Sequence, residues 1–551
     1  GLSIHSDRNV VLLNSDTEVY DGWLDRLHQA AERYPRIGTV TPLSNNATIC
    51  SYPRFLQDNP FPLELSYTEL DALIAEVNVA LEVEAPTGVG FCMYIKRDVL
   101  DEIGMFDEDA FGRGYGEEND FCQRAIRKGW RNIIAADVFV HHWGSASFQG
   151  EKAKRVQAAL KTMDRLHPGY QRDVADFIRR DPLCEARRRL DQARLMRLRR
   201  ERNVLLVCHS RGGGAERHLQ EEAQRLYHEG CGVFLMRPKA GRPSHVVFRH
   251  PTATQLPNLV SLELADTASM ASFMTDLGIT EIHTHSLVDF IPDAPDHLTT
   301  LVKSLGARWI ANLHDYKVVC PRVNLADENG LYCGEPSESV CDRCIGEKGS
   351  DFGVKDIRKW RAMHGRALLA ADQVRVPDLD AAERLQRYYP EVKFIVSPHE
   401  EIDPVDIMPP DVSANENMQI VVIGAIGKIK GFDVLLSCAR DARKRKLPLE
   451  FILMGYSMND RLLQEAGVRV TGRYLEENAF DSLNALSPHW VWLPSVWPET
   501  YSYTLSIAIK AGLPVAAFDI GAIARRLRTY NFADGLMPLE MACRPAAIND
   551  H

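Results

Sequence analysis

The sequence predicts an α/β fold in which short buried strands alternate with helices. Three stretches carry this prediction, because each joins an apolar strand to an apolar-periodic helix through a polar or glycine-rich loop. They are residues 203–216, 420–436 and 490–518. Strand, loop, helix and next strand form one turn of a doubly wound sheet. Ligands of such sheets bind beside the loops that follow the carboxyl ends of strands.

Bulk composition bounds the class of protein. The chain has 551 residues, enough for three or four domains, and its 45% hydrophobic and 25% charged residues are typical of a globular protein. The net charge of −10 argues against nucleic-acid binding. No apolar run approaches the ~18 residues of a spanning helix. The chain begins in a strand pattern without an initiator methionine, so we expect a fragment cut at both ends.

The cysteines indicate the compartment. Twelve of them, irregularly placed, are too few for a disulfide scaffold in a chain of this length. We therefore expect a reducing cytoplasmic environment.

Residues 1–150 are predicted to form the first domain. An apolar strand at residues 9–13 runs into Asn14 and Asp16, and a helix follows from about Asp21. A carboxylate at the end of a buried strand suits Mg²⁺ or Mn²⁺, which usually share their oxygen ligands with substrate phosphates. An Asx turn accounts for one aspartate here equally well, so both interpretations stay open.

Further polar motifs follow in the same domain. Residues 86–95 form a glycine-rich turn and a strand, and residues 114–120 bring Glu117, Glu118 and Asp120 to the start of a helix. A helix dipole alone favours acids at this position. Another strand, residues 133–140, then leads into the segment 141–148, which begins with two histidines.

Taken in order, these motifs resemble the C-terminal half of a family 2 glycosyltransferase of GT-A fold, over nearly all of residues 8–148. The resemblance implies an incomplete GT-A domain, because almost nothing precedes the aspartate motif Asn-Ser-Asp at residues 14–16. It implies that Asn14 and Asp16 contact a nucleotide-sugar donor, and that Asp16 and His142 hold Mn²⁺ or Mg²⁺, with His141 as the alternative ligand. Glu118 or Asp120 would be the catalytic base of an inverting transfer.

Residues 151–202 are predicted to be a helical connector, broken at residues 167–169 and 181–182. Its second part is very basic, with eight arginines: Arg187, Arg188, Arg189, Arg194, Arg197, Arg199, Arg200 and Arg202. The pattern favours a solvated linker helix. The alternative is peripheral docking on an anionic membrane surface.

The second half of the chain begins with a buried strand at residues 203–207. Three glycines follow before a helix, and Gly213 and Gly214 can bring backbone N–H groups close to a ligand. A later strand, residues 309–313, ends at His314.

Four cysteines then fall within twenty-five residues: Cys320, Cys333, Cys341 and Cys344. Four thiolates at such spacing can close a structural Zn²⁺ site. Unpaired loop thiols are the alternative.

A further strand-to-helix junction opens the last segment. The strand 420–423 leads to Lys428 and Lys430, which add charge to a helix N-terminus and suit a diphosphate. The strand 490–493 leads into a loop whose candidate ligand contacts are Glu499, Thr500, Tyr501 and Ser502.

This half resembles a family 4 glycosyltransferase of GT-B fold, on the glycine loop, Lys430-Gly431 and the Pro-Glu segment at Glu499. The resemblance implies two Rossmann-like halves, residues 203–410 and 411–551, with the donor held by these loops and His314 near the reacting sugar. It implies retention without a catalytic metal. The family's second glutamate is replaced by Ile507.

We therefore predict a bifunctional glycosyltransferase acting on a growing glycan or lipid-linked glycan, such as a bacterial surface polysaccharide or O-antigen. We expect it in the cytoplasm or at the inner face of the plasma membrane. The alternatives are a sugar- or partner-binding scaffold without turnover in one or both modules, and a GT-B-fold epimerase or phosphorylase.

Overall fold

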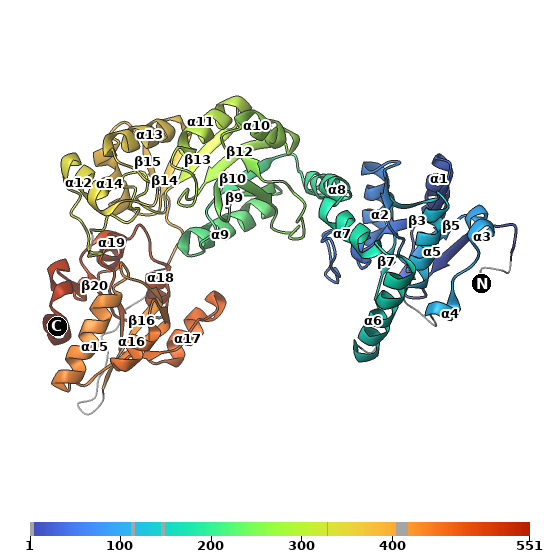
Figure 1. Ribbon diagram of the computed structural model, residues 1–551. Coiled ribbons are helices and arrows are strands. Elements are labelled where there is room, and N and C mark those ends of the chain that lie inside the picture. The colour runs from blue at the N-terminus through green and yellow to red at the C-terminus, as the bar shows by residue number, and fades with distance from the viewer. Residues whose placement is uncertain (1–4, 112–115, 145–148, 328, 404–416) are drawn as a thin grey trace. The chain divides into compact units, whose positions relative to one another are not determined.

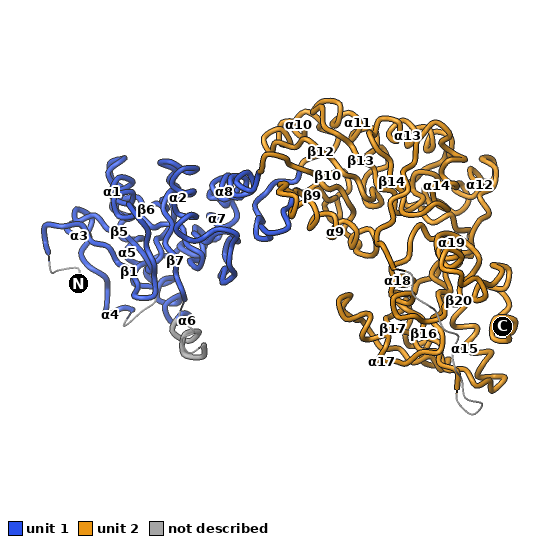
Figure 2. The backbone as a smooth tube through the Cα atoms, turned by 180° about the vertical axis from the view of Figure 1, so that it is seen from behind, with its two compact units in different colours: residues 1–199, 248–261 blue, residues 200–247, 262–551 orange. Residues whose placement is uncertain are grey.

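The computed structural model describes residues 5–111, 116–144, 149–327, 329–403 and 417–551, without the side chains of 149–155. Parts of three predicted segments therefore lie outside the described residues: 114–115 of the acidic motif, 145–148 of the histidine segment, and 404–416 around the predicted boundary between the two halves. The chain forms two compact units (Figure 2). Unit 1 comprises residues 1–199 and 248–261, and unit 2 comprises residues 200–247 and 262–551. Within the described part of the chain, no helix has the length and apolarity needed to cross a bilayer.

Unit 1 contains a mixed five-stranded sheet in the order β1-β5-β3-β6-β4. Its strands are β1 (Val10–Leu13), β5 (Cys92–Ile95), β3 (Ile37–Leu43), β6 (Arg131–Phe139) and β4 (Glu82–Ala85). Only β3 and β6 run parallel, whereas the other three pairs are antiparallel. A separate two-stranded ribbon joins β2 (Thr17–Glu18) to β7 (His141–His142).

Helices of unit 1 bury an apolar stripe against this sheet. In α1, for example, Leu27, Ala30 and Ala31 recur at helical spacing and are buried. The first five helices are α1 (Trp23–Arg33), α2 (Tyr67–Val77), α3 (Arg97–Ile103), α4 (Glu108–Phe111) and α5 (Glu117–Arg127).

The connector consists of three helices: α6 (Gln149–Leu166), α7 (Tyr170–Arg180) and α8 (Cys184–Arg197). Its breaks fall where the sequence predicts them. The prediction of a solvated linker helix is wrong, however, because Phe177 and Leu190 belong to the main core of unit 1. Two of the eight arginines, Arg187 and Arg194, are also buried.

Arg194 is held by a buried polar network. Its guanidinium binds both carboxylate oxygens of Glu64, at 2.7 and 2.6 Å, and donates to the hydroxyl of Tyr52 at 2.8 Å. That hydroxyl donates in turn to Asp191 at 2.7 Å. A buried arginine is tolerated only when carboxylates or other acceptors pair with it. These buried arginines of α8 therefore stabilise the packing of unit 1, although the charge pattern indicated a solvent-exposed helix.

The same network binds residues 248–261 to the rest of unit 1. Arg194 donates to the carbonyl of Gln255 at 2.9 Å, and the backbone N–H of Asn258 donates to Asp191 at 2.7 Å. The amide of Asn258 also donates to the carbonyl of Pro53 at 2.9 Å.

The N-terminal half of unit 2 is built on an eight-stranded sheet in the order β11-β10-β9-β8-β12-β13-β14-β15 (Figure 1). From β9 to β15 every pair is parallel. The strands are β8 (Asn203–Val207), β9 (Gly232–Lys239), β10 (Arg242–Arg249), β11 (Leu262–Glu263), β12 (Ile279–Thr284), β13 (Arg308–Asn312), β14 (Gln373–Val376) and β15 (Phe394–Val396). The helices are α9 (Gly214–His228), α10 (Thr267–Asp276), α11 (Ala294–Leu305), α12 (Glu338–Lys348), α13 (Ile357–Ala370) and α14 (Leu379–Tyr388).

The C-terminal half of unit 2 has a six-stranded, all-parallel sheet in the order β18-β17-β16-β19-β20-β21. Its strands are β16 (Met418–Ile426), β17 (Leu449–Ser457), β18 (Arg469–Val470), β19 (Trp490–Leu493), β20 (Val515–Phe518) and β21 (Leu536–Met537). Its helices are α15 (Phe432–Arg445), α16 (Asp460–Glu465), α17 (Ala479–Ala485), α18 (Tyr503–Lys510), α19 (Gly521–Thr529) and α20 (Pro545–Asp550). The predicted α/β fold with Rossmann-like sheets is confirmed.

Polar contacts join the two halves of unit 2. Arg525 on α19 binds both oxygens of Asp378, each at 2.7 Å. The hydroxyl of Tyr503 on α18 donates to Glu221 on α9 at 2.9 Å. Helices α18 and α19 of the C-terminal half thus contact α9 and Asp378, which follow the carboxyl ends of β8 and β14.

Replacing Arg194 by methionine should destabilise unit 1 by about 3–5 kcal/mol, because Glu64 and Asp191 would stay buried without their cation. Chemical unfolding followed by tryptophan fluorescence measures the change. The control is Arg189→Met on the same helix, where the side chain is about half exposed and, among the described residues, pairs with Glu185. Equal stability of the two variants would contradict the structural role of the network.

Candidate functional site

The ribbon of β2 and β7 brings Asp16 and His142 together in unit 1. Thr17 pairs with His142 across the ribbon, and Nε2 of His142 lies 3.4 Å from a carboxylate oxygen of Asp16. The other ring nitrogen, Nδ1, donates to the carbonyl of Asn46 at 2.9 Å. A neutral His142 therefore presents an unprotonated Nε2 to the carboxylate, which fits a cation bound by both groups.

Among the described residues, no third histidine, cysteine or carboxylate joins this pair within 4.8 Å. A small number of protein ligands is usual for Mg²⁺, which retains waters and substrate phosphates in its shell. The residues present therefore fit the predicted divalent ion. Asn14 lies beside them, with its backbone N–H bound to the carbonyl of Phe91 at 2.9 Å.

The alternative ligand His141 points to the other face of β7. Its ring is buried, with its centroid 4.1 Å from that of Tyr67 and 4.6 Å from that of Trp143. Burial lowers its pKa. Successive residues of a strand alternate between faces, so His142 is the histidine that meets Asp16.

Of the two candidate bases, Asp120 already has a hydrogen-bond or ion-pair partner on each carboxylate oxygen. One oxygen contacts His167 at 2.7 Å and the other accepts from Arg124 at 2.8 Å, in a buried position. Glu118 is half-buried beside Gly90, and burial raises its pKa above the usual carboxyl value. The geometry therefore favours Glu118, because a group committed to two partners is poorly placed to take a further proton.

In unit 2, most of the predicted donor-binding residues surround one cavity of about 410 Å³. They come from both halves: the glycine loop before α9, the loop after β16 and the loop after β19. The predicted residues in its lining are Gly213, Gly214, Lys430, Glu499, Tyr501 and Ser502. Ile507, which replaces the second glutamate, lies in the same wall.

Glu499 is buried at the floor of this cavity. Lys430 Nζ lies 3.0 Å from one of its oxygens, and the hydroxyl of Ser495 donates to the other. Ser502 caps α18, accepting from the N–H of Leu505 at 3.2 Å. A paired carboxylate beside a lysine and a capped helix start can bind hydroxyl and anionic groups together.

Two cavity cations were missed by sequence reasoning. Arg217 lies in the first turns of α9, with its guanidinium 3.9 Å from the ring centroid of Tyr503. Arg473 follows the short strand β18 and lies 4.2 Å from the ring centroid of Tyr456. Arg473 could have been found from the sequence, because it follows the short apolar pattern of β18, and a basic residue after a parallel strand faces the same edge as the other loops.

Two predicted donor contacts lie elsewhere. The hydroxyl of Thr500 donates to the carbonyl of His314 at 2.7 Å, so it joins the two halves and does not line the cavity. The aliphatic part of Lys428 packs against Gly330. Lys430, two residues later, is the lysine that reaches the cavity.

His314 lines a second cavity of about 600 Å³ in the N-terminal half of unit 2. The ring of His314 contacts the rings of three other histidines: His218, His285 and His399. Burial is the main reason why the pKa of His314 is held well below its usual value and that of His218 falls to about 4. The rings of His314 and His218 are therefore neutral near pH 7.

The four clustered cysteines line a third cavity, of about 350 Å³. They share one space as the sequence predicts, but no three of their described sulfur atoms lie within 4.8 Å of one another. Burial raises the pKa of Cys320 to about 12. A structural Zn²⁺ here remains a prediction.

No protein-family model matches the chain. Among curated proteins, it is 25% identical over 222 residues to an N-acetylglucosaminyl-diphospho-decaprenol L-rhamnosyltransferase found in two strains of Mycobacterium tuberculosis. That match covers 36% of this chain and 68% of the relative. The chain is thus homologous to a glycosyltransferase over part of its length.

Matches among solved structures are weaker. One is the pneumococcal O-GlcNAc transferase GtfA in complex with UDP and GlcNAc, with 15% identity, a TM-score of 0.36 and 57% coverage of each chain. The present chain therefore spans little more than half of that structure. Another is Anabaena HepE in complex with UDP, with 14% identity and a TM-score of 0.37 over 63% of this chain and 90% of that one.

The cavity floor depends on a glycine outside it. A Cβ on Gly521 would lie 2.6–2.8 Å from backbone atoms of Pro498 and Glu499, and its φ is +67°. Gly521→Ala should therefore destabilise unit 2 by about 2 kcal/mol or more, measured by chemical unfolding. Gly427→Ala, where a Cβ meets nothing within 4 Å, is the matched control. An unchanged stability of Gly521→Ala would contradict this packing.

Proposed function

We propose that the chain is a bifunctional glycosyltransferase with one nucleotide-sugar site in each unit. The homology to a curated rhamnosyltransferase supports the class of activity. The observation that carries the proposal for unit 2 is the cavity where Gly213, Lys430 and Glu499 meet, from three loops that are far apart in the sequence.

In unit 2, the diphosphate of the donor binds where the positive groups gather. Lys430, Arg217 and Arg473 all line the cavity, and the N-terminus of α18 adds its dipole. Glu499 then accepts hydrogen bonds from hydroxyls of the nucleotide sugar. Fixed cations balance the leaving diphosphate, so this module transfers without a catalytic metal. Retention of configuration is what the resemblance to family 4 implies.

Ile507 removes a hydrogen-bonding group from the wall of this cavity. The second carboxylate of the family pattern is replaced by an apolar side chain, so one set of hydroxyl contacts is lost. We infer that donor binding in unit 2 depends more heavily on Lys430 and Glu499 than it would with both acids.

In unit 1, Asp16 and His142 would hold Mn²⁺ or Mg²⁺, which supplies charge neutralisation for a leaving diphosphate. Glu118 takes the proton of the acceptor hydroxyl as its oxygen attacks the anomeric carbon, and the bond from that carbon to the diphosphate oxygen breaks. Attack from the opposite face inverts the configuration. Asp120 instead fixes helix α5 through His167 and Arg124.

The acceptor in this proposal is a growing glycan, free or lipid-linked. The rhamnosyltransferase relative is named for a lipid-diphosphate acceptor, and two transferases in one chain suit consecutive additions to a surface polysaccharide or O-antigen. Catalysis then occurs in the cytoplasm, with the acceptor lipid at the membrane face.

Calorimetric titration of UDP, GDP and dTDP into the whole chain tests both sites. Without metal, we expect binding that Lys430→Ala weakens about 10-fold or more, because a charge-assisted contact is lost. The control is Lys428→Ala, which lies against Gly330 and should leave this affinity unchanged. With Mn²⁺, a second binding event should appear, and Asp16→Ala should abolish it.

The rival functions give different results. A folded chain that binds none of these nucleotides would contradict the proposal and favour a scaffold. Nucleotide binding without sugar transfer to any glycan acceptor, but with conversion of the donor alone, would indicate an epimerase. Sugar release dependent on inorganic phosphate would indicate a phosphorylase.

The pH dependence of the metal-dependent activity tests Glu118. A base must be ionised, so the rate should fall as the pH drops through a pKa that burial has raised above the usual carboxyl value. Glu118→Gln should lower kcat by about 100-fold or more. Glu117→Gln is the matched control, since the Glu117 charge also raises the pKa of Glu118. It should retain activity and move the acidic limb to lower pH. Full activity in Glu118→Gln would rule out this role.

A further inference from the structure

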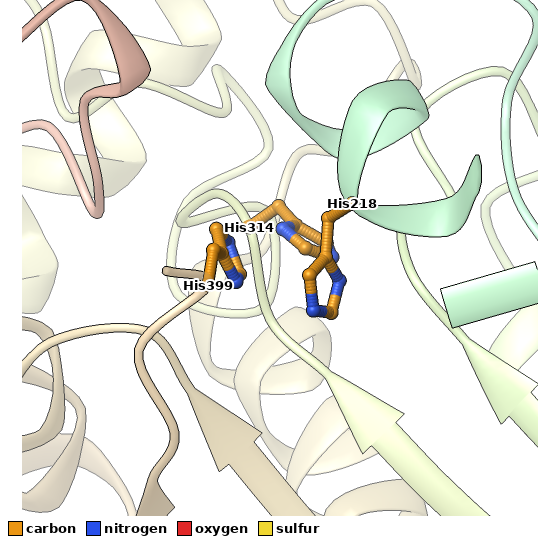
Figure 3. A group of neighbouring side chains, drawn as sticks. All are labelled: His218, His314 and His399. Carbon is orange, nitrogen blue, oxygen red and sulfur yellow. The ribbon is translucent and has the colours of Figure 1, made fainter. Parts of the chain in front are cut away.

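Three histidines line the 600 Å³ cavity of unit 2, and a fourth, His285, contacts two of them. His218 lies on α9, His285 follows β12, His314 follows β13 and His399 follows β15. Figure 3 shows the rings of His218, His314 and His399 gathered about one point. One ring nitrogen of each of these three lies within 4.8 Å of the other two.

Two nitrogen-to-nitrogen distances made by His285 are as short as those in a coordination shell. Nδ1 of His285 lies 3.4 Å from Nδ1 of His218 and 3.2 Å from Nε2 of His314. Zinc binds imidazole nitrogen at about 2.0–2.1 Å, so two nitrogens of a tetrahedral site lie about 3.3 Å apart. A chain of hydrogen-bonded imidazoles has similar distances. The other contacts of His285 and His399 distinguish a metal site from such a chain.

His285 is oriented by a carboxylate on its far side. Its Nε2 lies 2.8 Å from Glu222, in a bent contact. Glu222 also contacts Nδ1 of His283 at 2.8 Å, and Nε2 of His283 contacts Glu281 at 2.7 Å. A carboxylate beside Nε2 favours the proton there, which leaves Nδ1 of His285 as a lone-pair donor aimed at the other histidines. Metal-binding histidines commonly have this arrangement.

A lone pair at Nδ1 can accept only one hydrogen, yet two ring nitrogens face it. Nδ1 of His399 is also buried and has no hydrogen-bond partner among the described residues. A hydrogen-bond chain therefore leaves polar nitrogens unsatisfied, at a cost of about 1–3 kcal/mol each. A cation at the centre would satisfy them together.

We propose that His218, His314 and His399 bind a divalent transition-metal ion of the Zn²⁺ type, with His285, whose Nδ1 faces two of these rings, beside the site. Neutral imidazoles suit Zn²⁺, Ni²⁺ and Co²⁺, whereas Mg²⁺ and Ca²⁺ require oxygen ligands. This site is separate from Asp16 and His142 in unit 1 and from the clustered cysteines. The proposed metal site can be tested independently of the transferase activity, because the experiment measures metal binding itself.

The site also adjoins the neighbouring cavity. The ring of His399 lies 4.7 Å from that of Tyr501 and 5.7 Å from that of Tyr503, two residues that line the 410 Å³ cavity. A bound ion would hold the segment after β15 against α9 and so keep His399 beside these tyrosines.

The test measures metal bound to the full chain after treatment with a chelator and dialysis. Co²⁺ titrated into the protein should give visible absorption bands of a tetrahedral nitrogen site, without the near-ultraviolet thiolate bands of a cysteine site. Zn²⁺ should displace it. His314→Ala and His399→Gln should each lower the Zn²⁺ affinity at least 100-fold, whereas Cys341→Ser/Cys344→Ser should leave this site intact.

Glu222→Gln tests the positioning role and should weaken Zn²⁺ binding about 10–100-fold. Glu229→Gln, at the exposed end of α9, is its control and should bind as the unaltered chain does. Far-ultraviolet circular dichroism shows whether each variant folds, and the Co²⁺ spectrum of the unaltered chain tests the proposal if any variant does not. Absence of imidazole-type Co²⁺ bands, or Zn²⁺ affinity unchanged by both histidine substitutions in folded protein, would overturn the proposal and leave a hydrogen-bonded histidine cluster.

Discussion

The parallel direction of the strands is the constraint on which the sites of unit 2 depend. Parallel strands end at the same edge of their sheet, so the loops that follow them gather there whatever their distance in sequence. In the N-terminal half this edge collects the glycine loop, His285, His314 and His399; in the C-terminal half it collects Lys430, Glu499 and Ser502. Contacts such as Thr500 with the carbonyl of His314 then join the two edges. Unit 1, with its mixed sheet, uses the ribbon of β2 and β7 for the same purpose.

Buried charge in both units is held by paired groups. Arg194 binds Glu64, Glu499 binds Lys430 and Ser495, and Asp120 binds Arg124 and His167. An ion left unpaired in such positions would cost several kcal/mol, so each network holds its side chains in one arrangement. Glu118 differs, since burial raises its pKa and its only described hydrogen bond to another residue comes from the N–H of Gly116. The contrast with Asp120 separates a candidate base from a structural acid.

The periodicity of apolar residues predicts nearly every strand and helix around the sites, because burial of one face imposes a period of two or 3.6 residues. It also places Gly213, Lys430 and Glu499 on loops that follow the carboxyl ends of parallel strands. It does not distinguish Lys430 from Lys428, or His142 from His141, since neighbours in a loop or ribbon point in directions set by local backbone. The pattern wrongly predicts that α8 is exposed to solvent. Its arginines favour that prediction, but Glu64 and Asp191 pair with Arg194 inside the protein.

The sequence by itself determined the α/β class, the order of the elements, and the residue types that motifs place at strand ends, because these follow from local periodicity and turn chemistry. Only the tertiary structure decided which polar groups meet: Asp16 with His142, Arg217 and Arg473 with Glu499 around one cavity, and three histidines around another, with His285 beside two of them. Those meetings join residues tens to hundreds of positions apart. Their distances depend on how sheets and halves pack, and no local pattern records that packing.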